Sequence, residues 1–130
     1  MSIAPWLVFI YTDYMSLMFK KTLDSADSAP PVGPYSPAII SNNMMFISGQ
    51  IPILADGSMI MGDFEKETRQ VLLNITALLT AADLTWEHVI KVNIFTTDLN
   101  QFSTINQIYD TFVVAPYPAR AAVEVSALPK

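Results

Sequence analysis

The chain alternates between two hydrophobic periodicities, and their order predicts the fold. After a polar, proline-bearing linker at residues 24–31, two short apolar runs at 38–41 and 44–48 flank Asn42-Asn43. Asparagine tolerates the positive φ that a tight turn between antiparallel strands requires, so this segment predicts a β-hairpin. A short run at 17–22 predicts a strand before the hairpin.

Two later segments have the three- and four-residue spacing of amphipathic helices. Asp63 can cap the first, because an aspartate side chain accepts hydrogen bonds from free backbone N–H groups of the first turn. Asp98 or Asn100 can cap the second, and Pro116 and Pro118 end it. The positions expected to face the core are Phe64, Val71, Leu72, Ile75, Leu78, Leu79 and Ala82 in the first helix, and Phe102, Ile105, Tyr109 and Phe112 in the second.

Residues 89–97, between the helices, alternate as a strand with one buried face does. Ile90, Val92, Ile94 and Thr96 are expected to point inward. A last strand opens at Arg120, which gives the order β-β-β-α-β-α-β. This order predicts an α+β fold in which a mixed β-sheet carries two helices packed on one face. The other face stays open, and its apolar content predicts that another subunit of a homo-oligomer buries it.

Composition supports one globular domain, since 52% of the 130 residues are hydrophobic and 15% are charged. From residue 3 to residue 19 the only charged residue is Asp13. Polar interruptions within this apolar stretch, and lysines after it rather than before it, argue against a membrane span and a signal peptide. We therefore expect an N-terminal appendage at 1–16, one domain at 17–130, and no membrane partner.

The rarity of some residue types excludes several kinds of site. There is no cysteine, which excludes disulfides and thiol catalysis and fits a cytoplasmic location, with an organelle as the alternative. His88, the one histidine, lies in a short turn and is expected to be structural. A net charge of −5 argues against a nucleic-acid partner, and the four glycines form no phosphate-binding loop. No metal or organic cofactor is expected.

The segment at 118–130 places one arginine, Arg120, at the mouth of an otherwise apolar strand. A guanidinium presents a fixed fork of donors that matches a carboxylate, and it tolerates removal from water only when an acceptor replaces the lost hydration. The pattern predicts a small-carboxylate site. The alternative is a surface arginine in a solvated ion pair.

Four motifs in the same order make residues 29–130 resemble the RidA/YjgF family of imine deaminases. They are Gly33-Pro34-Tyr35-Ser36, Ser48-Gly49-Gln50-Ile51-Pro52, the run from Thr104 to Tyr109, and the segment at 118–130, with residues 68–74 of the first helix in support. The resemblance implies a chorismate-mutase-like homotrimer with clefts between subunits. It implies a hydrolase of metabolite damage control that converts 2-imino or enamino acids, such as 2-iminobutanoate or 2-iminopropanoate, to 2-keto acids and ammonia.

The resemblance also assigns roles to individual residues. Arg120 matches the catalytic arginine that holds the substrate carboxylate, with a backbone N–H of Gly49 completing the anion site. The carbonyl of Ala122 would then face the imine nitrogen.

Tyr35 matches the second catalytic residue, a tyrosine that closes the cleft, while Ser48 and Asn106 match polar residues that line or brace it. Each has a purely structural alternative: Tyr35 could pack on the sheet, Ser48 could end a strand, and Asn106 could bond locally on its helix. Gln50 and Phe102 could be pocket wall or core.

One departure from the family pattern bears on catalysis. Family members continue past Leu-Pro-Lys into a last strand that carries a water-orienting glutamate, whereas this sequence stops at Lys130. We therefore expect that strand and that carboxylate to be absent. The alternative to an imine deaminase is a non-catalytic small-carboxylate-binding or regulatory module built on the same cleft.

Overall fold

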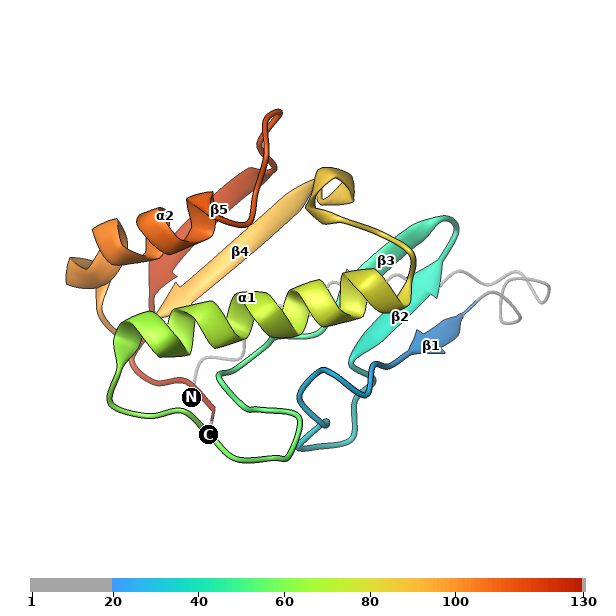
Figure 1. The fold of residues 1–130 in the computed structure, drawn as a ribbon, viewed down its shortest axis with the longest axis horizontal. Helices are drawn as coiled ribbons and strands as arrows, with labels where there is room; N and C mark the ends of the chain where they lie inside the picture. The colour runs from blue at the N-terminus through green and yellow to red at the C-terminus, as the bar shows by residue number, and fades with distance from the viewer. Residues whose placement is uncertain (1–19, 130) are drawn as a thin grey trace.

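The computed structural model describes residues 20–129, in which the elements follow the expected order (Figure 1). The expected appendage at 1–16 and the start of the strand expected at 17–22 lie outside the described residues. The strands are β1 (Lys21–Leu23), β2 (Ala38–Ser41), β3 (Met44–Ile47), β4 (Lys91–Thr96) and β5 (Ala119–Glu124). The α-helices are α1 (Phe64–Ala81) and α2 (Phe102–Asp110), and two 3₁₀ turns are η2 (Trp86–His88) and η3 (Leu99–Gln101).

The predicted hairpin is confirmed. Strands β2 and β3 pair antiparallel from Ala38 opposite Ile47 to Ser41 opposite Met44. Asn42 and Asn43 form the turn with φ values of 49° and 62°. β1 pairs antiparallel with β2, so the first strand group has the order β1-β2-β3.

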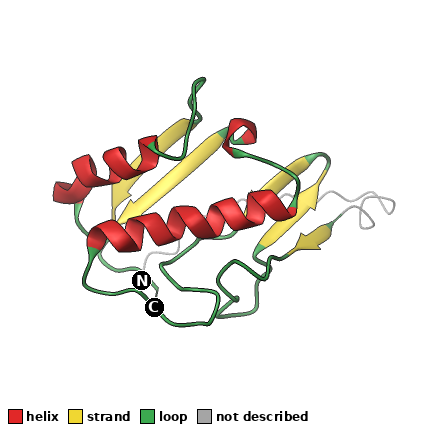
Figure 2. Cartoon of the chain, in the orientation of Figure 1, coloured by secondary structure: helices red, strands yellow, loops and turns green. Residues whose placement is uncertain are grey.

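The second strand group is a parallel pair, β4 and β5, joined through α2. Its register sets Lys91 opposite Ala119 and Thr96 opposite Glu124. Among the described residues the two groups share no ladder, so the strands of the predicted mixed sheet lie as two groups (Figure 2).

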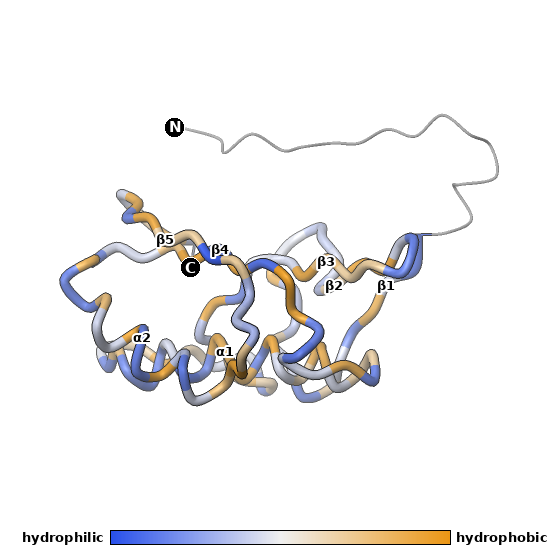
Figure 3. Tube along the Cα trace, turned by 90° about the horizontal axis from the view of Figure 1, so that it is seen from above, coloured by the Kyte–Doolittle hydropathy of each residue, from blue (hydrophilic) through white to orange (hydrophobic). Residues whose placement is uncertain are grey.

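Both helices cover the same face of the strand layer, as the sequence predicts (Figure 3). α1 begins where Asp63 Oδ1 accepts a hydrogen bond from the backbone N–H of Lys66 at 3.1 Å. Asp98 caps the 3₁₀ turn η3, which leads into α2, through a bond of 2.9 Å from the Asn100 backbone N–H. Neither helix within residues 20–129 has the length and apolar character needed to cross a bilayer.

One apolar core lies between the helices and the strands. Its buried members are Leu72, Leu79, Trp86, Ile108, Tyr109 and Val113. Met45 and Ile47 of β3 pack against this core, and so does Val92 of β4. The two strand groups are therefore joined by side-chain packing under a shared pair of helices.

The expected alternation along β4 is correct for three of its four inward positions. Val92, Ile94 and Thr96 are buried or half-buried, whereas Ile90 is 70% exposed. Ile90 precedes the strand, which begins at Lys91, so the strand's alternation does not fix the direction of its side chain.

A fully buried asparagine on α1 fixes the loop that follows β3. Asn74 Nδ2 donates to the carbonyl oxygens of Ile51 and Ile53 at 3.1 and 2.9 Å, and its Oδ1 accepts from Gln70 Nε2 at 2.9 Å. Because a buried carbonyl without a donor is costly, this one side chain determines how the loop sits on the helix.

We expect Asn74→Asp to destabilise the fold by about 3 kcal/mol or more, because a carboxylate would replace the donor and face two carbonyl oxygens in a buried site. The free energy of unfolding in urea measures this. Asn43→Asp is the matched control: its position is an exposed turn with positive φ that aspartate also tolerates, so a change within about 0.5 kcal/mol is expected. Equal losses for the two variants would contradict the assigned role.

Candidate functional site

Arg120 lies on the helix-covered side of β5, opposite Val92 of β4. Its guanidinium carbon is 5.3 Å from the ring centroid of Phe102 and 5.1 Å from that of Tyr109. Both distances are within the range of cation–π attraction. Phe102 and Tyr109 are seven residues apart on α2, which places both rings on the same face of the helix.

The guanidinium opens onto a groove of about 550 Å³ between α2 and the start of β5. The groove is lined by Asn106, Gln107, Tyr109, Asp110, Val113, Tyr117, Pro118 and Arg120. Within residues 20–129 no ion pair and no side-chain hydrogen bond uses Arg120, and Asp110 instead accepts a bond of 3.4 Å from the Tyr117 hydroxyl. The groove lining thus holds the positive charge of Arg120, the negative charge of Asp110 and the amide of Asn106.

Tyr109 supports this groove from the core side. Its side chain is buried, and within the described residues its hydroxyl oxygen has no hydrogen-bond partner. Burial raises the pKa of the Tyr109 phenol, an effect that the positive charge of Arg120 partly offsets. The phenol is therefore neutral at physiological pH, and Arg120 meets an uncharged ring.

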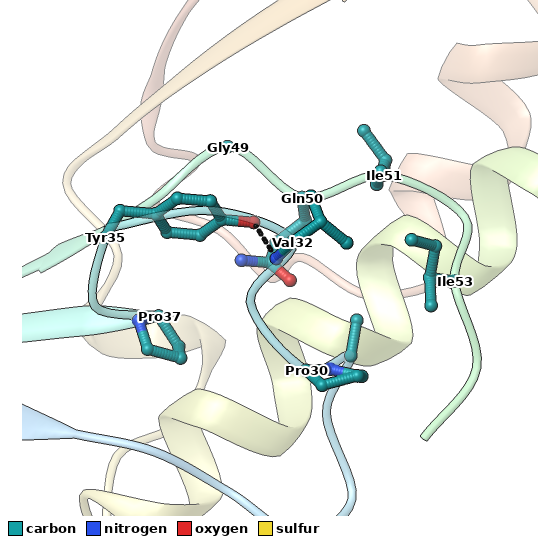
Figure 4. A pocket seen from close by; sticks show the side chains of 9 residues that line it. Pro30, Val32, Tyr35, Pro37, Gly49, Gln50, Ile51 and Ile53 are labelled. Atoms are coloured by element: carbon teal, nitrogen blue, oxygen red, sulfur yellow. Dashed lines mark hydrogen bonds between the residues drawn. The ribbon is translucent and has the colours of Figure 1, made fainter. Parts of the chain in front are cut away.

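Tyr35 and Gly49 line a different depression, which holds about 10 Å³, the space of one water molecule (Figure 4). The Tyr35 hydroxyl accepts a hydrogen bond of 3.1 Å from the backbone N–H of Val32, so the ring folds back over its own loop. A Cβ added to Gly49 would meet no atom within 4 Å, so the backbone there is open to an approaching group.

Ser48 and Gln50 brace the loop around Gly49. The Ser48 hydroxyl donates to the carbonyl oxygen of Ser36 at 2.7 Å, and Gln50 Nε2 donates to the carbonyl oxygen of Ser48 at 2.9 Å. Both side chains are thus engaged in holding backbone segments together.

The predicted site residues consequently fall into two sets. Asn106 and Arg120 line the groove beside α2, whereas Tyr35 and Gly49 line the small depression, and the two linings share no residue. Ala122 is half-buried on β5, on the same side of the strand as Arg120. A single copy of the chain does not place the Gly49 N–H and the Arg120 guanidinium in one depression.

Other titratable side chains have local structural roles. The backbone N–H of Thr85 donates to His88 Nδ1 at 3.1 Å, which closes the η2 turn and agrees with the structural role expected for His88. Glu124 accepts a hydrogen bond of 2.8 Å from the backbone N–H of Leu99, which ties β5 to the turn before α2. In the described part of the chain no three His, Asp or Glu side chains group as metal ligands.

Sequence reasoning assigned Asn74 and Tyr109 no role in the site, although each carried a signal. Asn74 lies three residues after Val71 and four before Leu78, which is a polar position on the apolar stripe of α1. Tyr109 was expected to face the core, and its seven-residue spacing from Phe102 puts both side chains on one face of the second helix.

Comparison with known proteins identifies the family. Residues 26–130 match the family model described as Endoribonuclease L-PSP. A RutC family protein of Pyrococcus horikoshii is 45% identical over 112 residues, which cover 85% of this chain and 89% of that protein. The 2-iminobutanoate/2-iminopropanoate deaminase of Bos taurus is 37% identical over 117 residues, which cover 89% of this chain and 85% of the enzyme.

Among solved structures, Escherichia coli TdcF with bound serine superposes with a TM-score of 0.79 at 36% identity, covering 85% of this chain and 90% of TdcF. The family model and these relatives carry different functional descriptions, so the choice of activity depends on the site itself. Their shared fold and the extent of the matches show that this chain belongs to the RidA/YjgF family.

Proposed function

We propose that this protein hydrolyses 2-imino acids to 2-keto acids and ammonia, with Arg120 holding the substrate carboxylate. The observation that carries the proposal is the Arg120 guanidinium, which rests on two aromatic rings at a groove and has no ion-pair partner within residues 20–129. An arginine held without a counter-ion suits an incoming carboxylate, because the anion restores the bonds lost with its hydration.

The reaction requires mainly positioning. A protonated imine is electrophilic, so water adds to its carbon and forms a tetrahedral carbinolamine. The C–N bond then breaks, the carbonyl forms, and the nitrogen leaves as ammonium, so that one water is consumed for each keto acid released. Fixing the carboxylate orients the C=N bond toward a held water, and orientation of this kind lowers a barrier by several kcal/mol, roughly 7 or more in favourable cases.

Two relatives support a small carboxylate as the ligand. The bovine relative is described as an imine deaminase, and TdcF is described with bound serine, which carries a carboxylate. The second candidate function is a non-catalytic module that binds small carboxylates in the same groove. It is favoured by Glu124, the one glutamate of β5, whose carboxylate is bonded to the Leu99 N–H and so is not free to orient water.

We further propose that copies of the chain assemble as a homotrimer, so that the loop of Tyr35 and Gly49 from one copy meets the Arg120 groove of another. In one copy these residues line separate depressions. Among the described residues, the helix-free face of the strands exposes the large apolar side chains of Met44, Phe46, Phe95 and Val123. A patch of this kind is uncommon on monomers and is normally buried against a partner.

We predict that Arg120→Ala abolishes ammonia release from an imine generated in situ by an amino-acid oxidase, with a trapping agent present as competitor. Arg120→Lys should lose about thirtyfold, because a point charge cannot reproduce two parallel hydrogen bonds worth about 2 kcal/mol. Arg69→Ala is the control, since Arg69 pairs with Glu65 on the exposed surface of α1 at 3.6 Å and should leave activity unchanged.

The same variants separate the two candidate functions. Binding of 2-oxobutanoate, measured by calorimetry, should disappear in Arg120→Ala under either function. If the unaltered chain binds the keto acid but releases no ammonia, the binding module is correct and the deaminase is wrong. Near-normal turnover in Arg120→Lys would show that the arginine does not clamp the carboxylate.

For the assembly, we predict a trimeric mass in light scattering at micromolar concentration, and dissociation to monomers in Phe46→Glu. A buried carboxylate without a partner would strongly disfavour the interface. Met61→Glu is the control, because Met61 is 78% exposed and lies in the loop before α1, outside the strands. A monomeric unaltered chain would refute the proposal.

A further inference from the structure

We propose that Phe102 and Tyr109 are positioning residues, which hold the Arg120 guanidinium in the orientation that receives a carboxylate. The inference extends the proposed function, since it depends on Arg120 being the carboxylate clamp. We refer to the rings of Phe102 and Tyr109 together as the aromatic ledge.

The geometry of the ledge accounts for the placement of the guanidinium. One guanidinium carbon lies 5.3 and 5.1 Å from two ring centroids, and both rings project from the same face of α2. Aromatic faces attract the cation without using its N–H donors. The hydrogen-bonding fork of Arg120 therefore stays available while the side chain is restrained, which an acidic partner could not achieve.

Restraint matters because a free arginine side chain has considerable rotational freedom to lose on binding. A guanidinium already oriented by two rings loses less of that freedom when the ligand arrives. The ledge should therefore strengthen binding of the carboxylate in the ground state and in the transition state alike.

Tyr109 is rigid enough for this role because it belongs to the core. Its ring packs edge-on against Trp86, with centroids 6.3 Å apart and planes at 85°. Trp86 is in turn fixed by a hydrogen bond of 2.9 Å from its Nε1 to the Thr76 hydroxyl on α1. The positions of α1 and α2 therefore determine where the ledge, and with it the Arg120 guanidinium, lies.

The ring of Tyr109, not its hydroxyl, should carry the effect. The hydroxyl oxygen is buried and has no hydrogen-bond partner within the described residues, so no hydrogen bond joins it to Arg120. Phenylalanine at this position keeps the ring face and removes a buried oxygen that lacks a hydrogen bond.

The test compares variants by calorimetric binding of 2-oxobutanoate and by steady-state kinetics. We expect Tyr109→Leu and Phe102→Leu each to raise the dissociation constant and KM by about five- to thirtyfold with little change in kcat, which corresponds to about 1–2 kcal/mol of cation–π attraction. Tyr109→Phe should retain normal binding and equal or greater thermal stability. Phe102 is only half-buried, so its variant keeps the test valid if Tyr109→Leu does not fold.

Phe112→Leu is the matched control. Phe112 packs on the same Trp86, with ring centroids 6.0 Å apart, but the guanidinium of Arg120 lies over Phe102 and Tyr109. This variant should lose stability while its dissociation constant stays unchanged. If Phe112→Leu raised the dissociation constant as much as Phe102→Leu does, the effect would be one of general packing and the proposal would be wrong.

An NMR measurement tests the ledge independently of the proposed function. Ring currents should shift the Arg120 side-chain protons upfield in the unaltered chain and in Tyr109→Phe, and each leucine variant should reduce the shift. Unshifted protons would overturn the ledge even if the chain deaminates imines. Shifted protons, with no keto acid binding and no ammonia release by the unaltered chain, would instead refute the proposed function and leave the ledge without a carboxylate to position.

Discussion

The domain depends on one apolar core, which joins two strand groups that share no ladder hydrogen bond within residues 20–129. β3 contributes Met45 and Ile47 to this core and β4 contributes Val92, while α1 and α2 cover them all. Backbone pairing stabilises each group internally, but only side-chain packing fixes one group relative to the other. Substitutions in the core therefore act on the relative position of β3 and β5, the strands on which the two sets of site residues depend.

Tyr109 connects that core to the site. The same ring packs against Trp86 on one side and lies under the Arg120 guanidinium on the other. Folding positions the Tyr109 ring, and this ring in turn limits where the guanidinium of Arg120 can lie in the groove. The stability of α2 and the geometry of the proposed carboxylate site are consequently physically coupled.

Local chemistry in the sequence was enough to predict most of the elements. The Asn42-Asn43 turn, the Asp63 cap and the alternation from Val92 to Thr96 are determined by neighbouring residues, and the structure confirms each of them. The division of the strands into two groups was not predictable, because strand pairing depends on contacts between distant segments. The prediction that Ile90 points inward was wrong for a related reason, because hydrophobic periodicity does not show at which residue a strand begins.

The site, like the fold, could be predicted from the sequence where local motifs determine it, but not where it depends on contacts between distant segments. The family resemblance assigned Asn106 to the site, and the motif containing Arg120 predicted an anion site there; both residues line one groove. The position of the Phe102 and Tyr109 rings beneath the guanidinium could not be predicted from that motif, because this position depends on how α2 crosses the start of β5. The role of Asn74 could not be predicted either, because its hydrogen-bond partners are the carbonyl oxygens of Ile51 and Ile53, more than twenty residues away in the sequence.

The contrast between two arginines shows why the ledge matters for ligand choice. Arg69 on α1 is paired with Glu65 at 3.6 Å, so its charge is already balanced on the protein and screened by solvent. Arg120 is restrained by neutral rings, and the nearby carboxylate of Asp110 accepts from Tyr117. Within residues 20–129 the Arg120 guanidinium makes no ion pair, although the carboxylate of Asp110 lines the same groove. Under the proposed function, this guanidinium binds a small ligand that carries its own negative charge, a property shared by 2-imino acids and the 2-keto acids they become.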